Sequence, residues 1–155
     1  MTISKLAASA ALLLLMSSCA TTIAEADWVK GEAPGASQKV LTEVTKMVFG
    51  KAGLPVVGPG FDPVTHTMRS GWRTDLVPIK RQRSRGFRER AWVKFTPATD
   101  GKLSFEVRVE TQINKNLARP LDLQYADWEE GPDSEKRARH ILQLLTASLR
   151  QGSRR

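Results

Sequence analysis

Two long stretches of alternating apolar and polar residues, separated by a short turn, constrain the fold of this 155-residue chain more than any other feature. The first stretch runs from Arg88 to Thr96 and the second from Leu103 to Ile113. Alternation over this length predicts β-strands with one buried side and one solvent-facing side. Asp100 and Gly101 are typical turn residues, so the two stretches are predicted to form an antiparallel hairpin.

Charged side chains select one register for this hairpin. If the numbers of opposed residues sum to 200, the facing pairs are complementary: Lys94 with Glu106, Arg90 with Glu110, and Trp92 with Arg108 as a cation–aromatic contact. A shift of two residues along the partner strand brings Arg90 opposite Arg108, and facing like charges are unfavourable. The register with the sum of 200 is therefore predicted.

Apolar residues at helical spacing predict one helix before the hairpin and one after it. The first helix is expected from Ser37, a suitable N-cap, to Phe49, and the second is expected to start at Gly131-Pro132-Asp133. The expected buried side chains of the first helix are Val40, Leu41, Val44, Met47 and Val48. Those of the second helix are Ala138, Ile141, Leu142, Leu145 and Leu149.

Residues 64–79 complete the predicted sheet. They alternate through His66, Met68 and Trp72 as a further strand or two, and Gly71 indicates a bend or bulge. The predicted fold class is α+β, a two-layer sandwich with both helices packed on one face of an antiparallel sheet of about three to four strands.

The amino-terminal residues have the organisation of a secretory leader. Lys5 is the only early charge, and an apolar run of eleven residues that ends at Met16 follows it. This run is about half as long as a bilayer-spanning helix requires. Residues 1–18 are therefore predicted to be a signal peptide, and Ala24-Glu25-Ala26 is an alternative cleavage site.

Met16-Ser17-Ser18-Cys19 resembles the lipobox of bacterial lipoproteins. In that family the leader is removed just before the cysteine, whose sulfur carries a diacylglycerol and whose new amino group is acylated. The resemblance implies lipidation of Cys19, and Ala20 after it implies the outer membrane, facing the periplasm. Two alternatives are an incidental cysteine in a longer leader and an unpaired thiol in a soluble secreted protein.

The remaining chain is expected to form one domain. Residues 19–36 have no sustained period and are predicted to be a flexible tether. Residues 37–150 are predicted to be a single α+β domain, and residues 151–155 a basic tail. The net charge of +8 favours an anionic partner over a cationic one.

A basic stretch provides the candidate binding residues. Between Arg69 and Arg90 there are eight basic and two acidic residues. The predicted strands place residues 80–85 at the tip of a hairpin, where guanidinium groups can contact phosphate or carboxylate oxygens. The candidate residues for anion or partner binding are Lys80, Arg81, Arg83, Arg85 and Arg88.

Two alternatives weaken this site. Charge at a hairpin tip also keeps the tip soluble and blocks edge-to-edge pairing, without any ligand. Residues 122–135 contain six acidic residues and no basic one, so they could neutralise the basic stretch if the two segments lie together.

Signals for catalysis are poor. His66 and His140 are the only histidines, and the chain has no nucleophile elbow, zinc-ligand spacing or paired-carboxylate motif. The protein is therefore predicted not to be an enzyme, with no cofactor and no metal, and an envelope hydrolase is a weak third option.

The function expected first is a non-catalytic binding or assembly module in the periplasm, held to the membrane through Cys19. In layout the chain is similar to small lipoprotein subunits of outer-membrane assembly machines. The second expectation is a domain that binds an anionic glycolipid or cell-wall polymer. Nucleic acid is not an expected partner for a secreted, anchored protein.

Overall fold

A computed structural model describes residues 27–79, 83–97, 102–120 and 122–152. Its elements are β1 (Val29–Pro34), α1 (Gln38–Lys51), β2 (Val56–Asp62), β3 (Thr67–Ser70), β4 (Arg73–Ile79), β5 (Arg83–Pro97), β6 (Lys102–Asn114), the short 3-10 helix η1 (Leu123–Tyr125), β7 (Trp128–Glu130) and α2 (Glu135–Gly152). In these ranges the strands form one antiparallel sheet in the order β1-β6-β5-β3-β2, with β4 also on β5 and β7 also on β6.

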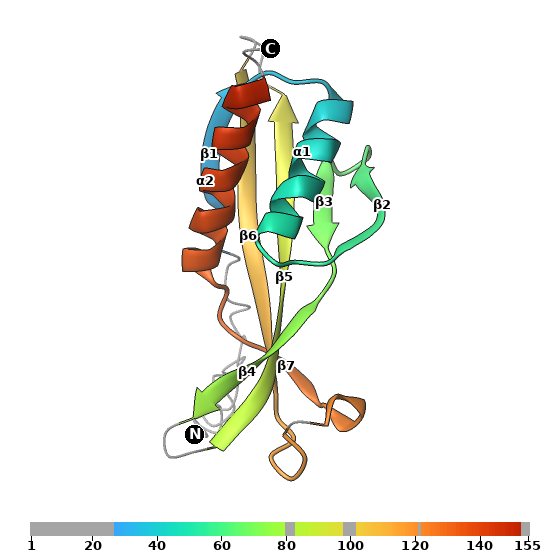
Figure 1. Ribbon diagram of the computed structural model, residues 1–155, viewed down its shortest axis with the longest axis vertical. Coiled ribbons are helices and arrows are strands. Elements are labelled where there is room, and N and C mark those ends of the chain that lie inside the picture. The colour runs from blue at the N-terminus through green and yellow to red at the C-terminus, as the bar shows by residue number, and fades with distance from the viewer. Residues whose placement is uncertain (1–26, 80–82, 98–101, 121, 153–155) are drawn as a thin grey trace, which may run out of the picture.

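The two α-helices lie side by side on one face of this sheet (Figure 1). The fold is therefore α+β with two helices and a large antiparallel sheet. The expected sheet of three to four strands is too small, because seven strands pair within the described ranges.

The long hairpin of β5 and β6 has the predicted register. The numbers of its opposed residues sum to 200 throughout, from Phe87 opposite Ile113 to Pro97 opposite Leu103. The predicted turn, residues 100–101, lies outside the described residues. Cross-strand charge pairing was thus enough to choose the register correctly.

Apolar side chains of the hairpin and the helices form the core. The fully buried hairpin residues are Ala91, Val93, Phe105 and Val107, with Val109 nearly so. Ile141 and Leu145 of α2 and Val48 and Phe49 of α1 cover them. The buried side of α2 matches the predicted stripe.

The ends of the helices are close to those expected. Ser37 is the N-cap of α1, and its Oγ accepts a hydrogen bond from the backbone N–H of Val40 at 3.4 Å. Helix α2 begins after Pro132 and continues to Gly152, so it includes the first two residues of the predicted basic tail.

The buried side of α1 differs from the prediction. Leu41 and Val48 are buried as expected, but Val40 and Met47 are 41% and 43% exposed. Thr45 and Phe49 occupy inward positions instead. The apolar residues of α1 cover a wide part of its surface, so the sequence pattern did not determine which side of the helix faces the sheet.

Strands β3 and β4 are one strand interrupted at Gly71, where the sequence predicted a bend. Their pairing partners on β5 are out of step by one residue, which is the signature of a β-bulge. The extra residue reverses the alternation, so Met68 faces the core whereas Trp72 lies on the opposite face. A β-carbon at Gly71 would lie 2.8 Å from Cγ1 of Val57, so only glycine fits without displacement.

Part of the expected tether is a strand. β1 pairs with β6 from Val29 opposite Val107 to Pro34 opposite Lys102. Its sequence has few apolar residues, and Gly31 lets α2 approach closely, because a β-carbon there would lie 3.0 Å from Cδ1 of Leu142. Backbone pairing and this close contact hold β1 in place. Neither requires alternating apolar residues, so the sequence of β1 lacks the pattern that identifies a strand.

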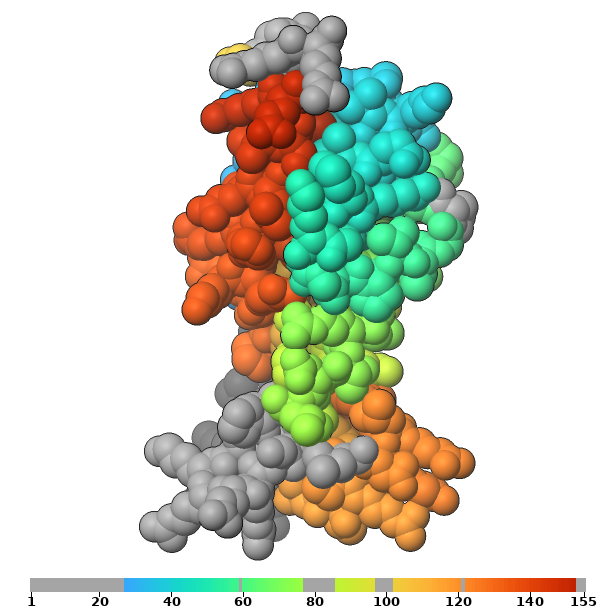
Figure 2. Space-filling view, in the orientation of Figure 1, coloured from blue at the N-terminus to red at the C-terminus, as the bar shows by residue number. Residues whose placement is uncertain are grey.

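The helices cover only one end of the sheet, as Figures 1 and 2 show. At the other end β4 and β7 flank the hairpin, and the loop that follows β6 is held by the buried side chain of Asn114. Asn114 Oδ1 accepts hydrogen bonds from the backbone N–H groups of Asn116 and Asp127, and Nδ2 donates to the carbonyl of Pro120. This end is therefore ordered by polar contacts.

Candidate binding face of the sheet

Charged and aromatic side chains gather on the face of the sheet opposite the helices, hereafter the open face. Because strands alternate, every second residue of the hairpin points to it, and most of these residues are polar or aromatic. Those of β5 are Arg88, Arg90, Trp92 and Lys94, and those of β6 are Glu106, Arg108, Glu110 and Gln112. Two features on this face are suited to binding: a stack of arginines and tryptophans, and a groove beside it.

Three arginines and three tryptophans alternate in one continuous stack, hereafter the Arg–Trp ladder. Its order is Trp128, Arg88, Trp72, Arg90, Trp92, Arg69. From the Trp128 end, the distances between guanidinium carbon and ring centre are 4.5, 4.5, 4.4, 5.0 and 5.7 Å. Each cation–aromatic contact contributes about 0.5 to 1 kcal/mol when exposed and more when water is excluded.

The ladder connects the hairpin to side chains from the end of the sheet that the helices leave uncovered (Figure 1). Trp72 comes from the bulge between β3 and β4, and Trp128 comes from β7. Arg88 lies between these two rings and donates from Nε to Gln112 Oε1 at 2.8 Å. The ladder therefore fastens both flanking strands to the hairpin.

Glu110 fixes the orientation of the middle of the ladder. Its Oε2 accepts hydrogen bonds from Arg90 Nε at 2.7 Å and from Trp92 Nε1 at 3.0 Å. Burial raises the pKa of Glu110, but the hydrogen bonds from Arg90 and Trp92 outweigh burial and hold the pKa below its ordinary value. Glu110 thus stays ionised and anchors a cation and a ring together.

A groove of about 1110 Å³ lies on the open face at the Arg69 end of the ladder. Its floor consists of Thr67, Arg69, Trp92, Lys94 and Arg108. Trp28, just before β1, and the irregular part of β2 also line it. Four interstrand spacings separate β1 from β2, so the groove crosses about 19 Å of sheet, enough for an extended ligand.

Arg69 and Lys94 are the groove cations that keep their charge unbalanced. Within the described ranges, neither side chain forms an ion pair, and both residues are exposed. Glu106 faces Lys94 in the register, but its Oε1 lies 3.3 Å from Lys30 Nζ instead. The two cations are therefore available to an acidic ligand.

The two other charged residues of the groove, Arg108 and Asp62, are held by hydrogen bonds. Arg108 donates to Asp133 from Nε at 2.6 Å and from Nη2 at 3.2 Å, and this bonding raises the pKa of Arg108. Asp62 accepts from Thr65 Oγ1 at 2.7 Å and from the backbone N–H of Val64, and these bonds lower the pKa of Asp62. Arg108 therefore offers no free charge to a ligand, whereas Asp62 keeps its negative charge, because its hydrogen-bond donors are neutral.

Strands β4 and β5 pair up to Ile79 opposite Arg83, so they form the predicted hairpin and residues 80–82 connect them. Lys80 and Arg81 lie outside the described residues, and Arg83 and Arg85 belong to β5 through backbone pairing with β4. Arg88, the candidate farthest from the tip, is held between two tryptophan rings. Cys19 also lies outside the described residues.

Sequence reasoning missed Arg69, Lys94 and Trp28 as groove residues. The signal for Lys94 was available, because Arg90, Trp92 and Lys94 alternate along one strand. The predicted contact of Trp92 with Arg108 is replaced: Trp92 contacts Arg90 and Arg69, and Arg108 turns to Asp133.

The basic and acidic segments meet without neutralising each other. Arg88 of residues 69–90 lies over Trp128 of residues 122–135. Among the described side chains, no ion pair joins these two segments. Their charges are balanced elsewhere or left exposed.

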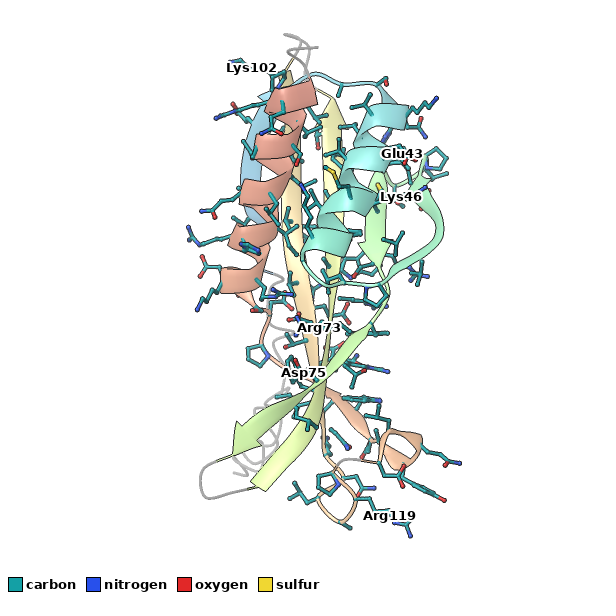
Figure 3. All side chains as sticks on the ribbon, viewed as in Figure 1. Glu43, Lys46, Arg73, Asp75, Lys102 and Arg119 are labelled. Carbon is teal, nitrogen blue, oxygen red and sulfur yellow. The ribbon has the colours of Figure 1, made fainter. Side chains whose placement is uncertain are left out.

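A second charged cluster lies on the helix side of the sheet. Glu89 is 4% exposed, and its Oε1 accepts from Arg137 Nη2 at 2.8 Å and from Arg73 Nη1 at 3.3 Å. Arg137 also donates to the carbonyl of Ala52 at 2.9 Å, and Arg73 lies beside Asp75 where β4 leaves the covered end (Figure 3). This cluster links α2, β4 and β5 below the apolar core.

Further properties of the chain complete the description of the site. No helix among the described residues is long and apolar enough to span a bilayer. In the same residues, no three His, Cys, Asp or Glu side chains lie together as metal ligands would. No protein-family model matches the chain, and a search of curated proteins finds no significant match.

Proposed function

We propose that this chain is a lipid-anchored protein of the bacterial envelope whose single domain docks a partner and does not catalyse a reaction. The likeness of Met16-Ser17-Ser18-Cys19 to a lipobox supports the anchor. Each buried CH₂ of an acyl chain contributes about 0.8 kcal/mol, so two or three chains hold a protein on a membrane. The proposed location is the outer membrane, facing the periplasm.

The groove on the open face is the proposed docking surface. The observation that supports it most is a pair of exposed cations, Arg69 and Lys94, that have no acidic partner among the described residues. They lie beside Trp92, whose ring is held in place by Glu110. An acidic group that enters the groove gains charge-assisted hydrogen bonds without displacing an internal ion pair. Because the ladder already fixes the floor, little conformational entropy is lost on binding.

The proposed anchor keeps this groove near the membrane. Trp28 lines the groove, and only nine residue steps separate it from Cys19. A fully extended chain of that length spans about 30 Å at most. The partner is therefore expected within the same distance of the bilayer, as for a subunit of a membrane-bound assembly.

An anionic glycolipid or cell-wall polymer is the second candidate ligand. The hydroxyl groups of Thr65 and Thr67 line the groove beside Lys94, which suits a sugar bearing phosphate or carboxylate. Charge reversal at Arg83 and Arg85 separates this groove from the hairpin tip. Unchanged binding in that variant supports the groove, and lost binding supports the tip.

Mass spectrometry of the mature amino terminus tests the anchor. The expected product begins at Cys19 and carries a diacylglycerol and an amide-linked acyl chain, and Cys19→Ser removes both. A product that begins after Ala26, or one that retains Met1, would contradict the anchor.

Site-specific photocrosslinking in native cells tests the docking surface. A photoreactive residue at position 67, in the groove, is expected to form a discrete protein adduct that the double change Arg69→Gln and Lys94→Gln removes. The control position is 40, which is exposed on α1. A glycolipid adduct supports the second candidate, and equal adducts from positions 67 and 40 contradict docking in the groove.

A further inference from the structure

The two ends of the Arg–Trp ladder differ. Arg88 and Arg90 each lie between two tryptophan rings, whereas Arg69 contacts only the ring of Trp92. Arg69 is exposed and lines the groove. The ladder thus ends in a ring at one side of the molecule and in a cation at the other.

The ring end shows which kind of segment caps an arginine of the ladder. There the chain supplies Asp127-Trp128-Glu129-Glu130, in which β7 pairs with β6 and the ring of Trp128 covers Arg88. One acidic neighbour of Trp128 pairs with a cation: Glu129 Oε1 lies 2.9 Å from Lys115 Nζ. The cap combines an aromatic ring with carboxylates.

The groove end has the complementary groups for a second cap of the same kind. Arg69 lies diagonally across β3 and β5 from Lys94, so their β-carbons are about 7 to 8 Å apart. In an extended peptide, residues two apart point to the same side. A ring over Arg69 therefore leaves a carboxylate two residues along the peptide within reach of Lys94.

We infer that the groove binds an acidic peptide segment of the partner that carries an aromatic side chain, with its ring on Arg69 and a carboxylate on Lys94. This inference rests on the proposed function and specifies what the docked partner presents. A saccharide supplies the negative charge but lacks an aromatic face for the guanidinium of Arg69. A single-stranded nucleic acid supplies both and is separated from the peptide by the test below.

The test measures binding of fluorescent peptides to the full chain, purified with its anchor in a neutral detergent. The first probe contains Asp-Trp-Glu-Glu between glycines, the second replaces Trp by Leu, and the third replaces the three acids by Lys. The first peptide is expected to bind best, the Leu peptide about three to ten times more weakly, and the Lys peptide not at all.

Variants of the groove assign the contacts. The double variant Arg69→Gln and Lys94→Gln is expected to weaken the first peptide at least about tenfold. Its control is Lys39→Gln with Lys51→Gln, which removes the same charge from exposed residues of α1 and leaves affinity unchanged. Arg69→Lys keeps the charge but loses the planar guanidinium that stacks on a ring, so it should reduce the preference for Trp over Leu.

Thermal unfolding of each variant separates weak binding from misfolding. If a groove variant unfolds early, competition by the first and second peptides on the unmodified chain still measures the preference for Trp. Equal affinity of these two peptides would overturn the inference.

Two other results would also overturn the inference. One is tighter binding of oligothymidylate, and the other is tighter binding of a lipid-free phosphorylated oligosaccharide.

If the Gln double variant weakens both acidic peptides equally while Trp and Leu peptides bind alike, the docking groove stands and the aromatic requirement fails. If the double variant changes nothing, the groove itself is not the docking surface.

Discussion

Arg90 and Glu110 face each other across β5 and β6, and the carboxylate of Glu110 accepts hydrogen bonds from Arg90 Nε at 2.7 Å and from Arg90 Nη2 at 3.2 Å. The same carboxylate accepts a hydrogen bond from Trp92 Nε1 at 3.0 Å. One ionised acid therefore holds a guanidinium and the ring beside it in the Arg–Trp ladder. Order at the end of the sheet that lacks helices depends on this polar network.

Replacing Glu110 by Gln is expected to lower the free energy of unfolding by about 1 to 2 kcal/mol at neutral pH, because Arg90 loses one of its two acceptors. Burial raises the pKa of Glu110, but the hydrogen bonds from Arg90 and Trp92 lower it by more, so the pKa lies below the ordinary 4.5. A lowered folded-state pKa stabilises the fold above the unfolded pKa, and this stabilisation disappears as pH falls through the folded pKa.

The unmodified chain should therefore exceed Glu110→Gln in stability by the full amount above pH 4.5, and this difference should shrink below pH 4.5. Denaturant unfolding at a series of pH values measures this difference. Glu106→Gln is the matched control on the same strand, since its ion pair with Lys30 is largely exposed and contributes less than about 1 kcal/mol. A difference for Glu110→Gln that grows on acidification would contradict the assignment.

Glu89→Gln is expected to destabilise the fold by about 3 kcal/mol, because it leaves Arg137 without its buried counter-charge and Arg73 with only the exposed Asp75. Glu32→Gln, on the exposed side of β1, is the control and should change stability by less than about 0.5 kcal/mol. Urea unfolding of the two variants provides the comparison. Equal stability of both variants would show that the Glu89 cluster does not stabilise the fold.

Two glycines should respond in opposite directions to alanine. Gly71→Ala places a β-carbon 2.8 Å from Val57 and 3.2 Å from Pro55, so it is expected to cost about 1 to 3 kcal/mol by overpacking the bulge. A β-carbon at position 50 meets no atom within 4 Å, and the residue lies inside α1. Gly50→Ala should therefore raise the free energy of unfolding by about 0.5 to 1 kcal/mol. Thermal denaturation measures both changes, and a stabilised Gly71→Ala would refute the bulge geometry.

The hairpin was predictable because its information is local and redundant. Alternation identified both strands, and opposite charges at Lys94 and Glu106 and at Arg90 and Glu110 chose between registers. β1 was not predictable in the same way. Its stability comes from pairing with β6 and from contact of Gly31 with α2, which depend on residues far away in the sequence.

The candidate site was harder to predict because its members come from separate strands. The bulge at Gly71 moves Trp72 to the open face, and a simple alternation through residues 64–79 places it with Met68 instead. Trp128 reaches the ladder only through the pairing of β7 with β6. The basic stretch of residues 69–90 includes Arg69 but not Lys94, and a run of charges does not show which cations form ion pairs in the fold.

The most direct test of the docking groove uses the indole N–H signals of the four tryptophans in ¹⁵N-labelled full chain. Trp28 and Trp92 line the groove, whereas Trp72 and Trp128 lie farther along the ladder. Titration with the unlabelled Asp-Trp-Glu-Glu peptide is predicted to shift the signals of Trp28 and Trp92 and to leave those of Trp72 and Trp128 in place. Shifts confined to Trp72 and Trp128, or no shift at saturating peptide, would contradict binding in the groove.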